Sequence, residues 1–411
     1  MEYYLYLLQV MGAANPRTLR LLKKFGGAKG AYRAITKGDV GFLRHREREN
    51  LSLSSLERSR EIIEYCHENG ISLITAEDDS YPHLLKNIYN PPLVLFCKGS
   101  LKVLEDKLAV AVVGSRETSF SARRAENEIC KALSAHGVVI VSGMAVGADK
   151  TAHTAALKSG GVTVGVLACG MNIDYPKGSM PFRDDVVRSG GAVITELLPG
   201  TRTDRGYFAL RNRIMSGLSH GLLIVECAEV SGCHITANHA TSQNRDIFCI
   251  PPSDLLNFRV TGVVRYLRDG AVPVYGVEDI LDAYAAGYGG RLIDYEKSRK
   301  PGKVGKVGST PRKKTAAKSS SSSAAKEPAA ETPPKRNMAE LGLSPEATVI
   351  VKRLKKGEAA EEELMTILGA ALAGKKRKAA AETRDLLAGL LLDLEIDGII
   401  DSLPGNMYKL L

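Results

Sequence analysis

The sequence predicts an α/β fold, a doubly wound parallel sheet, with a helical region before it and a winged helix after it. Residues 109–113 form a short and wholly apolar run, typical of a parallel strand buried on both faces. Residues 122–136 then place Ala125, Ile129 and Leu133 three and four positions apart, as on an amphipathic helix. Residues 138–141 return to a buried-strand run, which completes a βαβ unit.

The same alternation continues from residue 108 to about residue 281. Strand-like runs recur with helix-like segments between them, which is typical of a parallel sheet with helices on both faces. The predicted strands are residues 109–113, 138–141, 162–167, 192–195, 221–225, 247–250 and 271–274. Because the loops that follow parallel strands share one edge of the sheet, a ligand is expected at that edge.

The segment before the sheet reads as small and helical up to about residue 75. Asn15-Pro16 begins a helix that presents Leu19, Leu22 and Phe25, and Gly26-Gly27 ends it. This segment has the pattern of a helix-hairpin-helix (SAM-like) element or of a plain helical packing module. Residues 81–96 follow as an extended segment interrupted by prolines.

Beyond the sheet, residues 291–338 are rich in Lys, Ser, Pro and Ala, and we expect them to be disordered. Helical periodicity returns from Ser344-Pro345 and continues through residues 361–372 and 379–394. A hairpin around Pro404-Gly405 completes the winged-helix pattern, for which both duplex DNA, with Lys375–Lys378 on phosphates, and a protein partner remain open. The expected domains are residues 1–80, 81–288, 289–340 as a basic linker, and 341–411.

The charge of the chain is concentrated in one place. The 411 residues carry a formal charge of +10, and residues 297–337 hold twelve Lys or Arg against two Glu. The remaining residues therefore balance, so a nucleic-acid site in the sheet must be argued from local residues. No apolar run is long enough to cross a membrane, the N-terminus reads as a helix, and seven dispersed cysteines without a CxxC pair indicate reduced thiols in the cytoplasm.

The first loop of the expected site is Gly114-Ser115-Arg116, directly after the first strand. It stands where a dinucleotide-binding protein would carry a G-x-G-x-x-G fingerprint. Arginine can present a bidentate donor to a phosphate. Pairing of Arg116 with a local carboxylate such as Glu117 is the alternative.

The second loop runs from Ser142-Gly143 to Asp149 and enters a helix. The free N–H groups of a helix start favour an anion. Asp149 is a candidate ligand contact or an N-cap. We expect His153, one turn later, to be a packed, hydrogen-bonded histidine and not a general base.

The later loops add cations. Lys177, after Tyr175-Pro176, is a candidate phosphate contact or a solvated lysine. Four arginines then face the single acid Asp204, with Tyr207 and Phe208 among them: Arg202, Arg205, Arg211 and Arg213. Cations beside aromatic rings suit single-stranded nucleic acid. Arg211 and Arg213 alternate, so one of the two is also a candidate for a structural ion pair.

The sequence contains no nucleophile–His–acid set, no metal cluster and no Walker lysine. We therefore expect a binding protein and not an enzyme, with no metal and no cofactor.

Six motifs occur in order between Ser80-Tyr81-Pro82 and about Leu281. They are GSR, SGxAxGxDxxAH, the Tyr-Pro-Lys loop, ExxPGT, FxxRNRIxSGLS and SGxxITA. Together they resemble the DNA-processing protein A family (DprA, also called Smf), and the C-terminal region is similar to the winged-helix module of some members. The chain departs from the family pattern at Ala168, Asn172, Ala209, Cys233-His234 and residues 261–264.

The resemblance implies an extended Rossmann-like sheet in a single-stranded DNA-binding protein of natural transformation. Such a protein protects incoming DNA, helps to load the RecA recombinase and forms a homodimer. The implied DNA-binding residues are Gly114, Ser115, Arg116, Ser142, Gly143, Lys177, Phe208, Arg211, Asn212 and Arg213.

Two other functions stay open. Rossmann-like enzymes of the LOG type hydrolyse nucleoside monophosphates, but they carry a PGGxGTxxE signature that the run from Ser189 to Glu196 lacks. The sheet could instead be a scaffold that presents a recombinase-binding surface and does not bind DNA.

Overall fold

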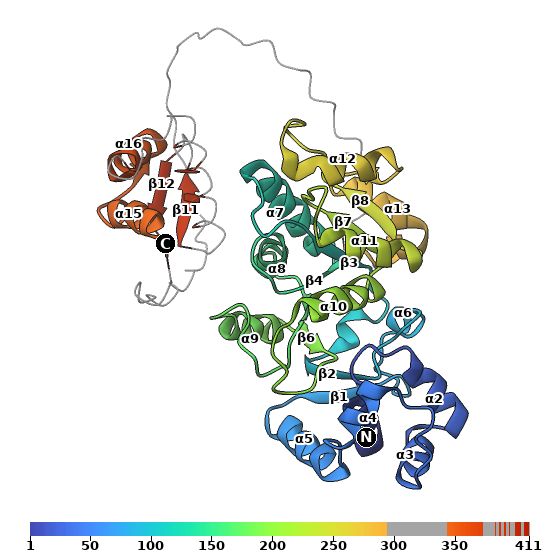
Figure 1. Ribbon diagram of the computed structural model, residues 1–411. Helices are drawn as coiled ribbons and strands as arrows, with labels where there is room; N and C mark the ends of the chain where they lie inside the picture. Colours follow the sequence, from blue (N-terminus) through green and yellow to red (C-terminus); the bar gives the residue numbers. More distant parts are fainter. Residues whose placement is uncertain are drawn as a thin grey trace, which may run out of the picture. The chain divides into compact units, whose positions relative to one another are not determined.

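The computed structural model describes residues 1–293, 343–372, 383, 386–387, 390–391, 394, 399–403 and 407–410. The chain divides into two compact units, Met1–Asp294 and Tyr295–Leu411 (Figure 1). Each unit has its own hydrophobic core. Within the described residues, none of the helices is both long enough and apolar enough for a membrane span.

The first unit contains a nine-stranded sheet in the order β1-β2-β6-β5-β4-β3-β7-β8-β9. Its strands are β1 Ser72–Thr75, β2 Val94–Gly99, β3 Ala109–Val113, β4 Val139–Ser142, β5 Thr163–Val166, β6 Ala192–Thr195, β7 Gly221–Ile224, β8 Asp246–Cys249 and β9 Val272–Pro273. The strands from β6 to β9 are all parallel. The predicted α/β class with its seven parallel strands is therefore confirmed.

The sequence prediction missed two strands at one edge. β1 pairs antiparallel with β2, and β2 pairs antiparallel with β6. The sheet is thus mixed, with a parallel body and an antiparallel edge. The segment predicted to be extended, residues 81–96, contains the short helix α6 His83–Lys86 and the first three residues of β2.

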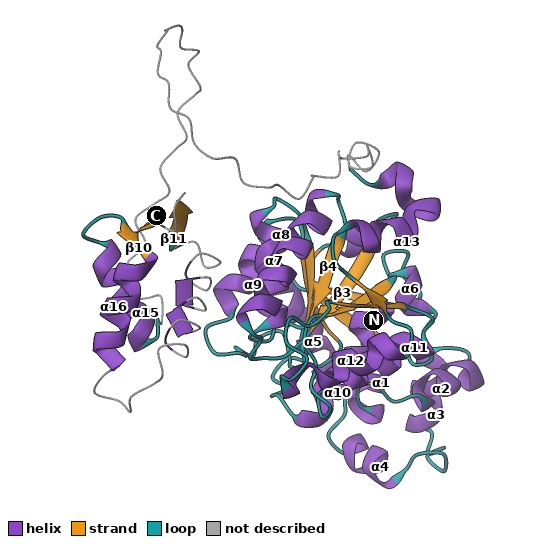
Figure 2. Ribbon diagram, turned by 90° about the horizontal axis from the view of Figure 1, so that it is seen from above, coloured by secondary structure: helices purple, strands orange, loops and turns teal. Residues whose placement is uncertain are grey.

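Helices cover both faces of the sheet (Figure 2). They are α7 Phe120–Ala135, α8 Ala148–Lys158, α9 Met180–Arg188, α10 Arg205–Gly217, α11 Cys233–Ser242, α12 Thr261–Arg268 and α13 Glu278–Tyr288, with 3₁₀ turns at η1 Leu101–Leu104, η2 Phe258–Val260 and η3 Gly289–Arg291. All five residues of β3 are buried, and its alternate residues share a core with α10 and α11. Burial on both faces explains why the sequence of β3 is wholly apolar.

The N-terminal helices are α1 Glu2–Met11, α2 Arg17–Phe25, α3 Ala28–Thr36, α4 His45–Leu51 and α5 Leu56–Glu68. α2 begins and ends as predicted, because the side chain of Asn15 accepts from the Arg17 N–H at 3.0 Å and Gly26 is left-handed. Its buried residues are Thr18 and Leu21, and Leu22 and Phe25 of the predicted face pack against the same core as Leu21. α1 also packs its Leu5 and Leu8 into the core that contains β2.

The second unit has α15 Pro345–Leu354, α16 Glu361–Leu372 and a small sheet in the order β10-β12-β11, with β10 Ala359–Ala360, β11 Ile400–Leu403 and β12 Met407–Leu410. The described residues of the predicted third helix, 383, 386–387, 390–391 and 394, are helical, and three of its leucines join the core. The rest of that helix, the Pro404-Gly405 turn, Lys375–Lys378 and most of the predicted linker lie outside the described residues. The winged helix therefore stays a prediction.

Candidate functional site

The candidate site lies where the winding of the sheet reverses. From β3 the chain continues to β4 on one side, and β7 lies on the other side. In doubly wound sheets the crevice at such a switch point, outside the carboxyl ends of the strands, is the place where ligands bind. Here it holds a cavity of about 360 Å³, lined by the loops after β3, β4 and β7 and by α10, which we call the carboxyl-edge cavity.

The first wall is the Gly114-Ser115-Arg116 loop. A Cβ at position 114 would lie 2.7 Å from the Cβ of Ala148, so glycine lets the loop approach the start of α8. Arg116 is exposed, and its guanidinium carbon lies 5.4 Å from the centre of the Phe208 ring. Glu117 is paired with Arg259 at 3.3 Å, so the alternative pairing between Arg116 and Glu117 is not the one the structure shows.

The loop after β4 is held in place by hydrogen bonds of the buried residues Ser142 and Asp149. The buried hydroxyl of Ser142 donates to the carbonyl of Val112 at 2.7 Å. The carboxylate of Asp149 accepts from the Ala145 N–H at 3.2 Å and also from the Gly143 amide. The N-cap of α8 is Gly147, so Asp149 ties the loop and is not the cap. Burial raises the pKa of Asp149, and Arg211 with these hydrogen bonds opposes that rise.

The two arginines of α10 have different surroundings. Arg211 donates from Nη1 to the carbonyl of Val166 at 3.0 Å, while its buried Nε has no partner among the described residues. Its guanidinium fills the space where Gly143 lacks a Cβ, and burial lowers the pKa of Arg211. Arg213 instead forms a buried ion pair with Glu196. The predicted structural ion pair is therefore that of Arg213.

The predicted site residues divide into two groups. Ser142, Gly143, Lys177 and Arg213 do not line the cavity, and Lys177 is exposed on the loop after Tyr175. Arg202 and Arg205 are exposed, Arg202 in the loop before α10 and Arg205 at its first residue. The residues brought together in the wall are Gly114, Ser115, Arg116, Phe208, Arg211 and Asn212.

His153 is a packed histidine, as predicted. Its Nδ1 lies 2.7 Å from the hydroxyl of Thr163. Burial lowers the pKa of His153 to about 3, so the ring is neutral near pH 7. No group of His, Cys, Asp or Glu in the described part of the chain is arranged to hold a metal ion.

Sequence reasoning missed the wall contributed by the loops after β7 and β8. Val230 is 95% exposed, and Arg259 reaches the cavity from η2. No local motif marks Arg259, because its place in the wall depends on the pairing of β8 with β7. With Arg259 included, the charged residues of the wall are three arginines and Asp149.

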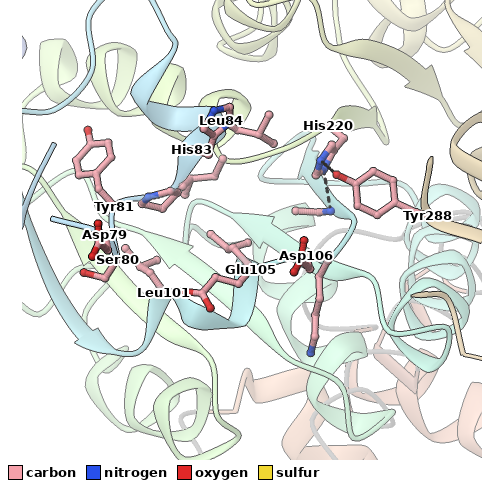
Figure 3. Close-up of a pocket in the computed structure, with 15 residues that line it drawn as sticks. Asp79, Ser80, Tyr81, His83, Leu84, Leu101, Glu105, Asp106, His220 and Tyr288 are labelled. Atoms are coloured by element: carbon pink, nitrogen blue, oxygen red, sulfur yellow. Dashed lines mark hydrogen bonds between the residues drawn. The ribbon is translucent and has the colours of Figure 1, made fainter. Parts of the chain in front are cut away.

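A second cavity, of about 510 Å³, lies at the opposite edge of the sheet, near the amino ends of β3 and β7 (Figure 3). We call it the amino-edge cavity. His220 accepts from the Ala109 N–H at 3.1 Å through Nδ1, and its Nε2 lies 2.6 Å from the hydroxyl of Tyr288. The charged residues of its wall, besides histidines, are Asp79, Glu105, Asp106 and Lys107.

Comparison with known proteins gives matches over most of the first unit. The sequence model of the family described as DNA recombination-mediator protein A matches residues 72–285. The chain is 36% identical over 215 residues to the DNA processing protein DprA of Bacillus subtilis, which spans 52% of this chain and 72% of that protein. It is 29% identical over 420 residues to the protein Smf of Synechocystis. This match covers 99% of this chain and 98% of that protein.

A solved structure is also similar. The X-ray structure of DNA processing protein A from Streptococcus pneumoniae superposes with a TM-score of 0.60 at 30% sequence identity. The superposition covers 69% of this chain and 97% of that one. The α/β sheet and the N-terminal helices are thus an arrangement already seen in an experimental structure.

Proposed function

Since this chain belongs to the DNA recombination-mediator protein A family, we propose that it binds single-stranded DNA in the carboxyl-edge cavity. Family membership confirms the resemblance inferred from the six ordered motifs. All six motifs lie within the matched residues 72–285.

The observation that carries the proposal is the placement of Arg116 over Phe208 at the mouth of the cavity. An exposed guanidinium attracts a phosphate, and an aromatic ring offers a face on which an unpaired base can stack. Arg211 lines the same cavity and adds a second guanidinium to its wall. Unpaired strands expose both phosphates and base faces, whereas duplex DNA keeps its bases stacked inside.

We infer that the chain acts as a binder and not as an enzyme. Asp149 is engaged by loop hydrogen bonds, so it is not placed as a general base. A hydrogen bond with Cys227 and burial raise the pKa of Cys233 well above its usual value, which keeps this thiol of the wall unreactive.

The wider role follows from the named relatives. Two of these relatives are called DNA processing proteins. We propose that the chain protects incoming single strands during natural transformation in the cytoplasm, helps a RecA-type recombinase to load onto them, and works as a homodimer. The DNA-binding residues of this proposal are Arg116, Phe208, Arg211 and Asn212 with the backbone of Gly114 and Ser115, and Lys177 contributes from the neighbouring loop.

The test is fluorescence anisotropy of a labelled oligothymidylate with the full chain. Arg116→Glu should weaken binding by about 1–3 kcal/mol, the range for a charge-assisted contact that is lost. Lys107→Glu is the matched control, because it makes the same charge reversal at the amino-edge cavity and should change the affinity less than about twofold.

The same experiment gives two further measurements, competition by duplex DNA and the dependence of affinity on salt. Duplex DNA should compete poorly with the single strand. The slope of affinity against salt should fall by about 0.7 when Arg116→Gln removes one phosphate contact. Equal binding by wild type and Arg116→Glu, with an unchanged salt slope, would contradict the assignment of the cavity.

A further inference from the structure

A second pairing of an arginine with a phenylalanine occurs at Arg259, which lines the same cavity as Arg116 and Phe208. The guanidinium carbon of Arg259 lies 5.8 Å from the centre of the Phe258 ring, close to the 5.4 Å of the first pair. Phe258 is 71% exposed, and Arg259 lines the cavity. The same two chemical groups, a cation and an aromatic ring, therefore occur together a second time at this cavity.

Arg259 is positioned before any ligand arrives. Its backbone N–H donates to the side chain of Asn257 at 3.0 Å, and its Nη2 lies 3.3 Å from the carboxylate of Glu117. Glu117 directly follows Arg116, so this exposed ion pair joins η2 to the loop after β3. The pair is solvated and weak, so a phosphate can replace the carboxylate at small cost.

The surface beside Arg259 is apolar and open to solvent. Leu255 is 71% exposed, Leu256 is 96% exposed and Val230 is 95% exposed. Exposed apolar side chains are typical of binding surfaces. Leu255 and Leu256 shortly precede Phe258 in the chain, and Val230 lines the same cavity as Arg259.

We propose that Phe258 and Arg259 form a second nucleotide contact for the bound single strand. Arg259 takes a phosphate in place of the Glu117 carboxylate, and Phe258 stacks on an unpaired base next to the apolar side chains. In the free protein the Glu117 carboxylate occupies the position of that phosphate, so Glu117 competes with DNA for Arg259. The inference rests on the proposed function and adds a contact that the six motifs do not contain.

The chain contains no tryptophan, which allows a direct test. Phe258→Trp introduces a single fluorophore at the proposed stacking position, and its emission should be quenched by oligothymidylate with the same midpoint as anisotropy. Tyr275→Trp is the matched control, because Tyr275 is 82% exposed and lines neither cavity. Its emission should not change.

Affinity measurements by anisotropy make the test independent of the fluorophore. Phe258→Ala should weaken binding by roughly five- to 150-fold, the range for one lost base stack. Glu117→Gln should strengthen binding, because the competing carboxylate is removed. Arg259→Gln should weaken it and lower the salt slope by about 0.7.

The failures are distinguishable. If Arg116→Glu weakens binding while the Phe258→Trp emission and the Phe258→Ala affinity stay unchanged, the second contact is wrong and the proposed function stands. In that case a protein partner would be the occupant of the apolar surface. If the wild-type chain shows no anisotropy change with single strands, the proposed function itself fails.

Discussion

The two cavities of the sheet lie at opposite ends of the same strand and carry opposite charge. The carboxyl-edge cavity, beyond Val113 at the end of β3, has three arginines against Asp149. The amino-edge cavity, at Ala109, has three carboxylates against Lys107. Outside the basic segment the positive and negative charges of the chain nearly balance, but the fold places arginines at one edge of the sheet and carboxylates at the other.

The cavities differ less in how their polar groups are bonded. At the amino edge both ring nitrogens of His220 are engaged, by Ala109 and by Tyr288. Buried arginine nitrogens without a partner in the described part of the chain occur at both edges, the Nε of Arg245 near the amino edge and the Nε of Arg211 at the carboxyl edge. The sign of the charge in the wall is therefore what distinguishes the two edges, and a polyanion fits the carboxyl edge.

The largest expected effect is a loss of stability, and it tests whether Arg213 supports the fold at the carboxyl edge while Arg211 belongs to the binding site. Arg213→Ala leaves Glu196 buried without its partner and should lower the free energy of unfolding by about 3–5 kcal/mol. Urea unfolding measures the change. The double variant Arg213→Ala/Glu196→Ala should recover part of it, because the unpaired carboxylate is gone. A single variant as stable as wild type would remove the distinction between Arg211 and Arg213.

An intermediate effect is expected at the amino-edge cavity. His220→Ala leaves the Ala109 N–H without its acceptor and should lower the free energy of unfolding by about 1–3 kcal/mol, with DNA affinity unchanged. Tyr288→Phe, which removes only the hydroxyl, should cost less. A loss of DNA affinity in His220→Ala at full stability would show that the amino edge also binds.

The same residue predicts a pH dependence of stability. Burial lowers the pKa of His220 below its ordinary value of about 6.5. The unfolded chain therefore takes up the proton first, and the stability that neutral His220 provides is complete above about pH 6.5 and is lost as the pH falls through the lowered pKa. As the pH falls below about 6.5, the wild type should lose stability faster than His220→Ala.

The smallest expected effect concerns the charge of the amino edge. Glu105→Gln removes one exposed carboxylate from the amino-edge cavity. At about 0.15 M salt, where the screening length is about 8 Å, the gain in DNA affinity should stay below about twofold. A larger gain would mean that the acidic rim repels the strand and that the two edges are not independent.

The parallel body of the fold could be predicted because burial on both faces leaves a strong local signal. Runs such as Ala109–Val113 are apolar at every position. β1 lacks that signal, since it is a four-residue edge strand with an exposed Ser72. β2 has a buried apolar run at residues 94–97, but this run follows Pro91-Pro92 and reads as the end of the extended segment. Their pairing is set by tertiary contacts and not by a pattern in the sequence.

The site could be predicted as far as its residues follow strands in short loops. Gly114, Arg116 and Arg211 belong to local motifs, and the cavity includes all three. Three other features depend on residues at least 17 positions away along the chain. They are the hydrogen bond from the Ser142 hydroxyl to Val112, the ion pair of Arg213 with Glu196, and the contact of Arg259 with Glu117. Spacing alone does not carry such information.

The antiparallel edge has a practical consequence for handling the protein. β1 lies at the margin of the sheet and covers the outer backbone groups of β2. A shortened chain that began after Thr75 would leave those N–H and C=O groups open, and open strand edges recruit other chains into aggregates. The solubility of the first unit therefore depends on four residues that belong to neither cavity.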